Sequence, residues 1–397
     1  MRSDVDGSSM GRLKVLLPFV EDYLRWTGGE VYIGNVLRLL SLPEMGNRAA
    51  VYLENNSHLR DAEIAARYGR HAVVAAVMPP EKGWMRLRSL VPLVDGGRRS
   101  AVDVTFPVTS ADPHWRRYRN PVFWIPDFQH KVLPEHFSAD EIAGRDAAFT
   151  HVARRKAALL LSSHATAADF GHFFPKHRVT VHVWQFCSTI VPEDAAPIDP
   201  RAAFNLPDKY LYIPNQFWTH KDHLTAFRAL RLLRDQGLAV YFVCTGSTDD
   251  YRNRDYYRGL QNYLGEAGLT ESVTILGVLP RPEQLAILRH AAAVLQPSLF
   301  EGWSTVVEDN RAIGRPIFLS DIPVHIEQAP ETGTFFRARD AESLASAIAA
   351  AWPRLRPGPD AQAEVMAQAL ATKRRAACAR RLLDILADAA GSPSLRC

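Results

Sequence analysis

The sequence has few cysteines and no long apolar run. Its 397 residues include four cysteines, which are widely spaced and form no CxxC pair. This excludes a disulfide scaffold and gives no zinc-binding pattern. No apolar run approaches the roughly 20 residues that a membrane-spanning helix requires. Residues 1–11 are polar and lack the apolar segment of a signal peptide, so we expect a cytoplasmic protein.

The sequence also has no strong excess of either charge. Its 47 basic and 43 acidic residues give a formal net charge of +4, which is too small to indicate a nucleic-acid partner. Basic residues nevertheless gather in two places, the second beside Trp115 and Tyr118: Arg86, Arg88, Arg98 and Arg99, then Arg116, Arg117 and Arg119. Two interpretations remain open, namely solvated loops or a surface that meets anionic lipids or a phosphorylated acceptor.

Short apolar runs alternate with longer amphipathic segments along the chain. The predicted strands are 13–19, 50–54, 71–78, 122–125, 157–162 and 179–183, then 210–213, 239–244, 273–276, 293–296 and 316–319. Several of them are continuously apolar, as is typical of parallel strands that helices cover on both faces. The alternation predicts doubly wound α/β sheets.

The amphipathic segments predict helices. After His220, apolar residues at Leu224, Phe227, Leu230 and Leu233 form one stripe. Further helices are expected at 282–290, 341–351 and 362–386. A proline-rich stretch, 192–200, is interpreted as a linker between domains. We therefore expect an N-terminal domain at 12–195, a second domain at 204–370, and a C-terminal helix at 371–390 that returns to the first domain.

The most informative motif spans residues 293–309. A buried strand ends at Gln296, Glu301-Gly302 follows in a loop, and a helix is expected to begin at Ser304 or Thr305. Ligands of open α/β sheets bind at such strand ends, and the free N–H groups of a helix start suit a diphosphate. Glu301 can accept hydrogen bonds from sugar hydroxyls, and Glu308 or Asp309 from a ribose. The alternative is a simple capping box between Thr305 and Glu308.

This passage resembles the nucleotide-binding signature of glycosyltransferase family 4, in which a loop Glu-Gly is followed by an acidic residue eight positions on. That position holds Asp309 here, where the family usually has Glu, so the ribose ligand is either Asp309, which we favour, or Glu308. The resemblance implies a GT-B fold, in which two Rossmann-like domains face each other across a cleft. It also implies retaining sugar transfer from a nucleotide sugar, without a metal or other cofactor.

Two further loops extend the resemblance. In residues 213–223, Lys221 matches a lysine that neutralises the donor diphosphate in the family, whereas Gln216 stands near the place of its usual arginine. This wording is similar to that of a bacterial subgroup that builds surface polysaccharides such as lipopolysaccharide, which implies GDP-mannose or a related donor. Gly28-Gly29 matches a glycine pair that closes over the donor phosphates.

Two loops are expected near the sugar and the base. Asp127 and His130 follow a predicted strand, and the resemblance implies that Asp127, with His130 in place of the usual cleft histidine, contacts the reacting sugar. The alternative is a capping aspartate and a packed histidine. Gly277-Val278 corresponds to a loop that lies against the nucleotide base. His325 and Glu327 receive no assigned role.

The resemblance therefore implies a hexosyltransferase, with Glu301, Asp127, His130 and Lys221 at the reacting centre. Its partners would be a nucleotide-sugar donor and a glycan or lipid-linked acceptor, at the inner face of the membrane. Two alternatives stay open: an epimerase or phosphorylase of the same fold, and a non-catalytic subunit that binds sugars or nucleotides.

Overall fold

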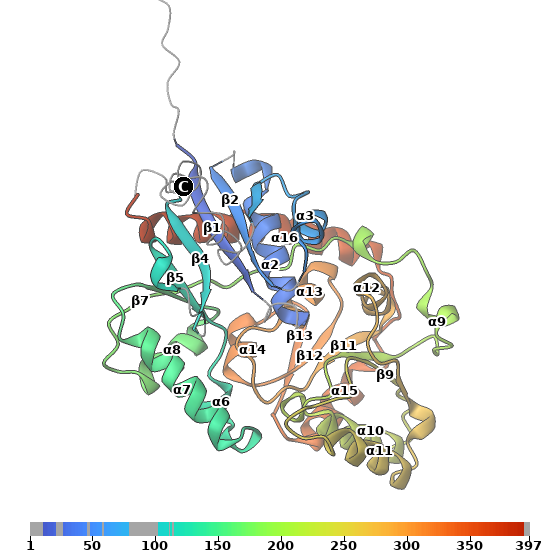
Figure 1. Cartoon of the computed structure of the whole chain (residues 1–397). Coiled ribbons are helices and arrows are strands. Elements are labelled where there is room, and N and C mark those ends of the chain that lie inside the picture. Colours follow the sequence, from blue (N-terminus) through green and yellow to red (C-terminus); the bar gives the residue numbers. More distant parts are fainter. Residues whose placement is uncertain are drawn as a thin grey trace, which may run out of the picture.

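A computed structural model describes residues 11–20, 27–45, 48–57, 59–78, 102–110, 112 and 115–392. The first basic cluster, from Arg86 to Arg99, lies outside the described residues. Figure 1 shows two α/β units that stand side by side, each built around one sheet. The expected architecture of two parallel α/β domains is confirmed.

The first sheet has seven strands in the order β3-β2-β1-β4-β5-β6-β7, and every neighbouring pair is parallel. Their bounds are β1 Leu13–Val20, β2 Ala49–Asn56, β3 Val74–Met78, β4 Val104–Thr109, β5 Pro121–Ile125, β6 Ala158–Leu161 and β7 Thr180–Val183. The helices of this half are α2 Thr27–Leu40, α3 Asp61–Tyr68, α6 Gln129–Val132, α7 Ala139–Ala153 and α8 His164–Phe173.

The second sheet has six parallel strands in the order β10-β9-β8-β11-β12-β13. Their bounds are β8 Leu211–Pro214, β9 Phe242–Thr245, β10 Val273–Ile275, β11 Ala293–Gln296, β12 Ile317–Ser320 and β13 Gly333–Phe336. The helices are α9 Pro200–Ala203, α10 His223–Asp235, α11 Tyr256–Glu266, α12 Arg281–His290, α13 Thr305–Ile313, α14 Pro323–Gln328, α15 Ala341–Ala351 and α16 Ala361–Ala389. Single 3₁₀ turns lie at Pro43–Met45, Trp115–Arg117, Pro134–His136, Pro192–Asp194, Thr219–Lys221 and Thr270–Ser272.

Two strands were not expected from the sequence. The strand β4 lies between β1 and β5 but carries Pro107, and proline normally argues against a central strand because it lacks an N–H. The pairing of β4 with β5 shifts register between Thr105 and Val108, which accommodates the proline. The edge strand β13 exposes half of its short length and therefore has no continuous apolar run.

The last helix, α16, joins the two halves (Figure 1). Near its start Gln368 donates to the carbonyl of Ala312 at 2.6 Å, and Glu364 accepts from Arg289 at 2.8 Å, both in the second domain. Further along, the Cys378 carbonyl accepts from the Trp184 indole at 3.0 Å. Residues of α16 complete the core of the first domain: Cys378, Ala379, Leu382, Leu383, Ile385, Leu386 and Ala387. The second half of α16 therefore belongs to the first core.

No helix among the described residues is long and apolar enough to cross a membrane. The stripe predicted after His220 is seen in α10, where Phe227, Leu230 and Leu233 are buried. The helix begins after Asp222, whose carboxylate accepts from the Thr225 amide at 3.3 Å. The exact domain limits and the linker at 192–200 stay predictions.

Candidate active site

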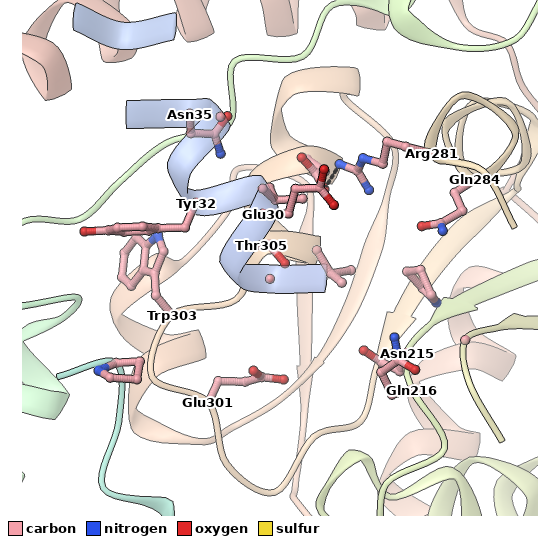
Figure 2. Close-up of a pocket in the computed structure, with 18 of the residues that line it drawn as sticks. Glu30, Tyr32, Asn35, Asn215, Gln216, Arg281, Gln284, Glu301, Trp303 and Thr305 are labelled. Atoms are coloured by element: carbon pink, nitrogen blue, oxygen red, sulfur yellow. Dashed lines mark hydrogen bonds and ion pairs between the residues drawn. The ribbon is translucent and has the colours of Figure 1, made fainter. Parts of the chain in front are cut away.

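A cavity of about 1400 Å³ lies between the two domains and is lined by both. Figure 2 shows Arg281 and Gln284 on one side of this pocket and Glu301 on the other, with Thr305 between them. Of the residues expected at the site, the following line the cavity: Gly28, Asp127, Gln216, Lys221, Val278, Glu301, Thr305 and Asp309. The lining does not include Gly29, His130, Gly277, Ser304 or Glu308.

Glu301 forms the centre of a polar network at the carboxyl ends of β8 and β11. The Lys221 ammonium lies 2.5 Å from a Glu301 carboxylate oxygen, and both side chains are largely buried. The same oxygen accepts from Gln296 at 3.0 Å, and Gln296 in turn accepts from Asn215 at 2.7 Å. These contacts fix the Glu301 carboxylate and bring the predicted pair, Glu301 and Lys221, together.

The start of α13 borders the cavity at Thr305. Ser304 is the N-cap, and its hydroxyl accepts from the Val307 amide at 3.4 Å. Ser304 is buried, so its expected contact with a ligand is corrected to a structural role. The Gln328 amide holds Ser304 from behind, because it accepts from the Ser304 N–H at 3.2 Å and donates to its carbonyl at 3.0 Å. The structure thus positions the helix start, whose free N–H groups favour an anion.

The two neighbouring carboxylates, Glu308 and Asp309, point in different directions. Glu308 is buried outside the cavity lining, where it accepts from Gln328 at 3.0 Å and lies 3.4 Å from Arg311. Burial raises the pKa of Glu308 to about 7. Asp309 lines the cavity, accepts from the Ser188 hydroxyl at 2.7 Å and forms an ion pair with Arg281. Between the two predicted alternatives, geometry favours Asp309.

Arg281 was not identified from the sequence. It begins α12, directly after the loop around Gly277-Val278, and its guanidinium borders the cavity beside Asp309. Gln216 is uncharged, and its side-chain oxygen accepts from the Ser247 backbone amide at 2.6 Å. Arg281 therefore supplies a positive charge to a site that lacks an arginine at Gln216. The sequence feature that could have identified Arg281 is its position at the start of a predicted helix, directly after the Gly277-Val278 loop that was expected to contact the nucleotide base.

The glycine positions have separate roles. Gly28 lines the cavity from the first turn of α2, whereas Gly29 is buried behind it. Gly277 is outside the lining. It has a φ of 69°, a conformation that glycine favours, and its carbonyl accepts from the Gly246 amide at 2.8 Å. Its neighbour Val278 is 70% exposed and lines the cavity. The turn at Gly277 therefore places the side chain of Val278, and not Gly277, at the cavity.

Asp127 reaches the cavity, but His130 does not. The Asp127 carboxylate accepts from the Gln129 amide at 3.0 Å and lies 3.5 Å from Arg145. His130 is fully buried, with its Nε2 atom 3.1 Å from Asp146, and burial lowers its pKa. The prediction that His130 faces the cleft is wrong, because helix α6 turns this side chain into the core of the first domain. His130 is instead a packed histidine, which was the alternative interpretation of this loop.

The first domain contributes an aromatic wall that sequence patterns did not reveal. Tyr32 stacks on Trp124 with ring centroids 4.2 Å apart, and both line the cavity. Trp303 lies on the other side of the domain boundary, and its indole donates to the Phe186 carbonyl at 2.7 Å. These aromatic residues come from distant parts of the chain, so only the fold brings them together.

The domains also touch directly beside Glu301. A Cβ atom added to Gly302 would lie 2.1 Å from the Pro126 carbonyl oxygen, so only glycine fits between the two loops. The Thr166 hydroxyl donates to the Gly302 carbonyl at 3.2 Å. Glu327 of α14 accepts from the amides of His164 and Ala165, each at 2.8 Å, at the start of α8. The structure is therefore an arrangement in which the cleft is closed around the cavity.

Within the described residues, no cluster of three or more His, Cys, Asp or Glu side chains is arranged as a metal site. The absence of a metal requirement stays an expectation.

Comparison with known proteins shows what the second domain and the overall fold are similar to. Residues 208–352 match the family described as Glycosyl transferases group 1. No curated protein sequence gives a significant match.

Similar solved structures cover nearly the whole chain. The Anabaena protein HepE, solved with UDP and glucose, aligns with a TM-score of 0.67 and 16% identity over 95% of this chain and 100% of its own. Sucrose-phosphate synthase from Thermosynechococcus elongatus gives 0.61 and 14% over 96% of each chain. The lipopolysaccharide glycosyltransferase WaaG gives 0.56 and 14% over 94% of this chain and 99% of its own. The chain therefore has the GT-B fold, and its second domain matches the group 1 glycosyl transferases.

Proposed function

We propose that this protein is a glycosyltransferase that moves a hexose from a nucleotide sugar to a glycan or lipid-linked acceptor. The observation that carries the proposal is the convergence of Glu301, Lys221 and the start of α13 on one interdomain cavity. This is the arrangement that the resemblance to family 4 implies. The match of residues 208–352 to group 1 glycosyl transferases supports it independently.

The donor would lie along the second domain. Its diphosphate would meet the start of α13 and Lys221, and the charge that develops on the leaving group would be stabilised there. Binding would draw Lys221 from Glu301 toward the phosphate, which frees the Glu301 carboxylate for sugar hydroxyls. Asp309, held by Arg281 and Ser188, would face the ribose, and Val278 the base.

The sugar would sit between Glu301 and Asp127. These residues lie on opposite domains, and the Gly302 contact shows that their loops meet: an added Cβ there would be 3.1 Å from the Asp127 Cβ. In a retaining mechanism the departing phosphate accepts the acceptor proton, so no separate protein base is needed. Closure of the domains would exclude water and limit hydrolysis of the donor.

The donor is proposed to be a nucleoside-diphosphate hexose, with GDP-mannose favoured by the wording of residues 213–223. HepE has been solved with UDP-glucose, which makes that donor the necessary comparison. We further propose a role in surface polysaccharide synthesis at the inner face of the membrane. WaaG, which shares the fold, acts in lipopolysaccharide biosynthesis.

A thermal-shift panel of GDP-mannose, UDP-glucose and dTDP-glucose tests donor binding. We expect at least one to raise the melting temperature, and the variant Glu301→Ala to keep its fold but lose transfer by about 100-fold or more. The control is Glu266→Ala, an exposed residue of α11. If no nucleotide stabilises the protein, or if the Glu301 variant transfers normally, the proposal fails. Interconversion of the donor without acceptor would favour the epimerase, and binding without turnover the non-catalytic subunit.

A further inference from the structure

A second polar cluster lies at the end of the cavity where α6 and α7 of the first domain face the loops after β8 and β9. It consists of Arg145, Arg252 and Gln129, and all three line the cavity. Arg252 comes from the second domain and donates to the Gln129 side-chain oxygen across the cleft at 3.2 Å. The proposed donor contacts use none of these residues. The cluster is therefore a separate feature of the same cavity.

The aromatic residues around Arg252 hold its guanidinium in place. It lies 4.8 Å from the ring centre of Phe137 in the first domain and 5.1 Å from that of Trp218 in the second. Its side chain is only 7% exposed. Such packing fixes the direction of the guanidinium and reduces the entropy lost when a ligand binds.

The unpaired groups of the cluster are mainly hydrogen-bond donors. Gln129 is only 6% exposed, and the nitrogen of its side-chain amide has no hydrogen-bond partner within the described residues. The Arg252 guanidinium has Asp250 at 3.5 Å, but that carboxylate already accepts from the Thr219 and Arg252 amides at 3.1 Å. The Arg145 guanidinium lies 3.5 Å from Asp127 and 5.0 Å from the ring centre of Phe137, and these two contacts leave several of its N–H groups available. Buried donors without partners are costly, so this end of the cavity favours a ligand that supplies acceptor oxygens.

The position of the cluster separates it from the expected diphosphate site. The start of α13 and Arg281 lie on the side of the ribose and phosphates. Gln129, at the start of α6, and Arg145, in α7, both contact Asp127 and so lie on the side of the proposed sugar. A group bound there would belong to the molecule that receives the sugar.

We propose that Arg252, Arg145 and Gln129 form a subsite for an anionic group, a phosphate or a carboxylate, on the acceptor. This inference rests on the proposed function and adds the chemical class of its second substrate. Two guanidinium groups and a buried amide nitrogen match the several acceptor oxygens of such a group. A neutral sugar in the same place would leave some of these N–H groups without a charged acceptor.

The test compares the binding of glucose 6-phosphate, glucuronic acid and glucose by isothermal titration calorimetry. It uses the full chain, both free and saturated with the nucleoside diphosphate that stabilises it most. We expect at least one of the charged probes to bind about tenfold tighter than glucose. Arg252→Gln and Arg145→Gln should each remove most of that preference and leave nucleoside diphosphate affinity within about twofold. Arg258→Gln, at a 71% exposed arginine of α11, is the matched control and should change neither.

Two results would overturn the inference. One is equal binding of the charged and neutral probes by the wild-type chain. The other is a loss of nucleoside diphosphate affinity in Arg252→Gln, which would place the anion on the donor. Melting temperatures identify a variant that fails to fold, and Arg145→Gln, at a 39% exposed side chain, then provides the measurement. Because the probes are also titrated into the free protein, failure of all nucleotides to bind would reject the proposed function separately.

Discussion

The two domains face one cavity with different kinds of side chain. The second domain presents charges that are already paired within it, as in Lys221 with Glu301 and Arg281 with Asp309. The first domain presents aromatic rings, the partly engaged Asp127 and the unpaired amide of Gln129. The difference shows that a ligand must replace existing ion pairs in the second domain, whereas in the first it meets the Gln129 amide nitrogen, which has no partner within the described residues.

The largest expected effect comes from a substitution that separates the two domains where their loops meet at Gly302. Gly302→Ala would place a methyl group 2.1 Å from the Pro126 carbonyl oxygen, so the loops could no longer meet. We expect turnover to fall about 100-fold, because the groups from the two domains would be misplaced by an ångström or more. Donor binding to the second domain should persist. Turnover and small-angle scattering measure the loss of activity and of closure.

The control for this variant is Gly265→Ala in α11, where an added methyl group meets nothing within 4 Å. It should leave activity and closure unchanged. Normal turnover in Gly302→Ala would show that the closed arrangement is not required for the reaction.

An intermediate effect is expected on the pH dependence of stability, through Glu308, the carboxylate that is buried outside the cavity. The pKa of Glu308 is raised from 4.5 to about 7 by burial, so the folded state binds its proton more tightly than the unfolded state. Its contribution to stability is therefore present below pH 4.5 and is lost as the pH rises toward 7. Glu308→Gln removes this dependence. Relative to the wild type, the variant should gain about 2 kcal/mol of unfolding free energy between pH 5 and pH 8.

Urea denaturation of both proteins at the two pH values checks this prediction. The comparison is needed because burial lowers the pKa values of His223, to about 3, and His325, to about 4, which destabilises both proteins alike as the pH falls below 6.5. Asp309→Asn is the matched control, since it removes the neighbouring carboxylate that lines the cavity. A pH-independent difference between wild type and Glu308→Gln would contradict the assigned burial, and weaker nucleotide binding in Glu308→Gln than in Asp309→Asn would reverse the choice of ribose ligand.

The smallest expected effect concerns the contact between the domains at α14. Glu327→Ala removes an acceptor from the free amides of His164 and Ala165 at the start of α8. We expect a loss of about 1 kcal/mol in closure, seen as an approximately fivefold lower kcat/KM with nearly unchanged nucleotide affinity. Glu271→Ala, at an exposed residue of the same domain, should show neither change. An equal effect of both variants would exclude a specific role for Glu327.

Local patterns in the second domain predicted its fold and brought together residues of the candidate site. The continuous apolar strands 293–296 and 316–319 are seen within one residue of their expected ends, and Glu301 and Lys221 converge as expected. These positions could be predicted because each depends on a strand, the loop directly after it and the start of the next helix. The same locality singled out two neighbours, Glu308 and Asp309, and the spacing of the resemblance favoured Asp309, the one that lines the cavity.

The first domain was harder to predict for physical reasons. Proline inside β4 hid a central strand, and the short helix α6 turned His130 away from the cleft that a sequence pattern assigns to it. Arg252, Glu327 and Tyr32 each line up with a partner more than 90 residues away in the chain. Sequence periodicity cannot predict such contacts, because that of Tyr32 depends on how α2 packs on the sheet, and those of Arg252 and Glu327 depend on how the two domains dock.

The path of α16 has a consequence for how the protein is made. The first domain draws seven of its core residues from positions 378–387, although its sheet is complete by Val183. During synthesis from the N-terminus, that sheet must therefore wait, with part of its apolar face uncovered, until almost the entire second domain has emerged from the ribosome. The segment that completes the first core is thus made only after the second domain, and a nascent chain halted before residue 378 should expose apolar surface to chaperones.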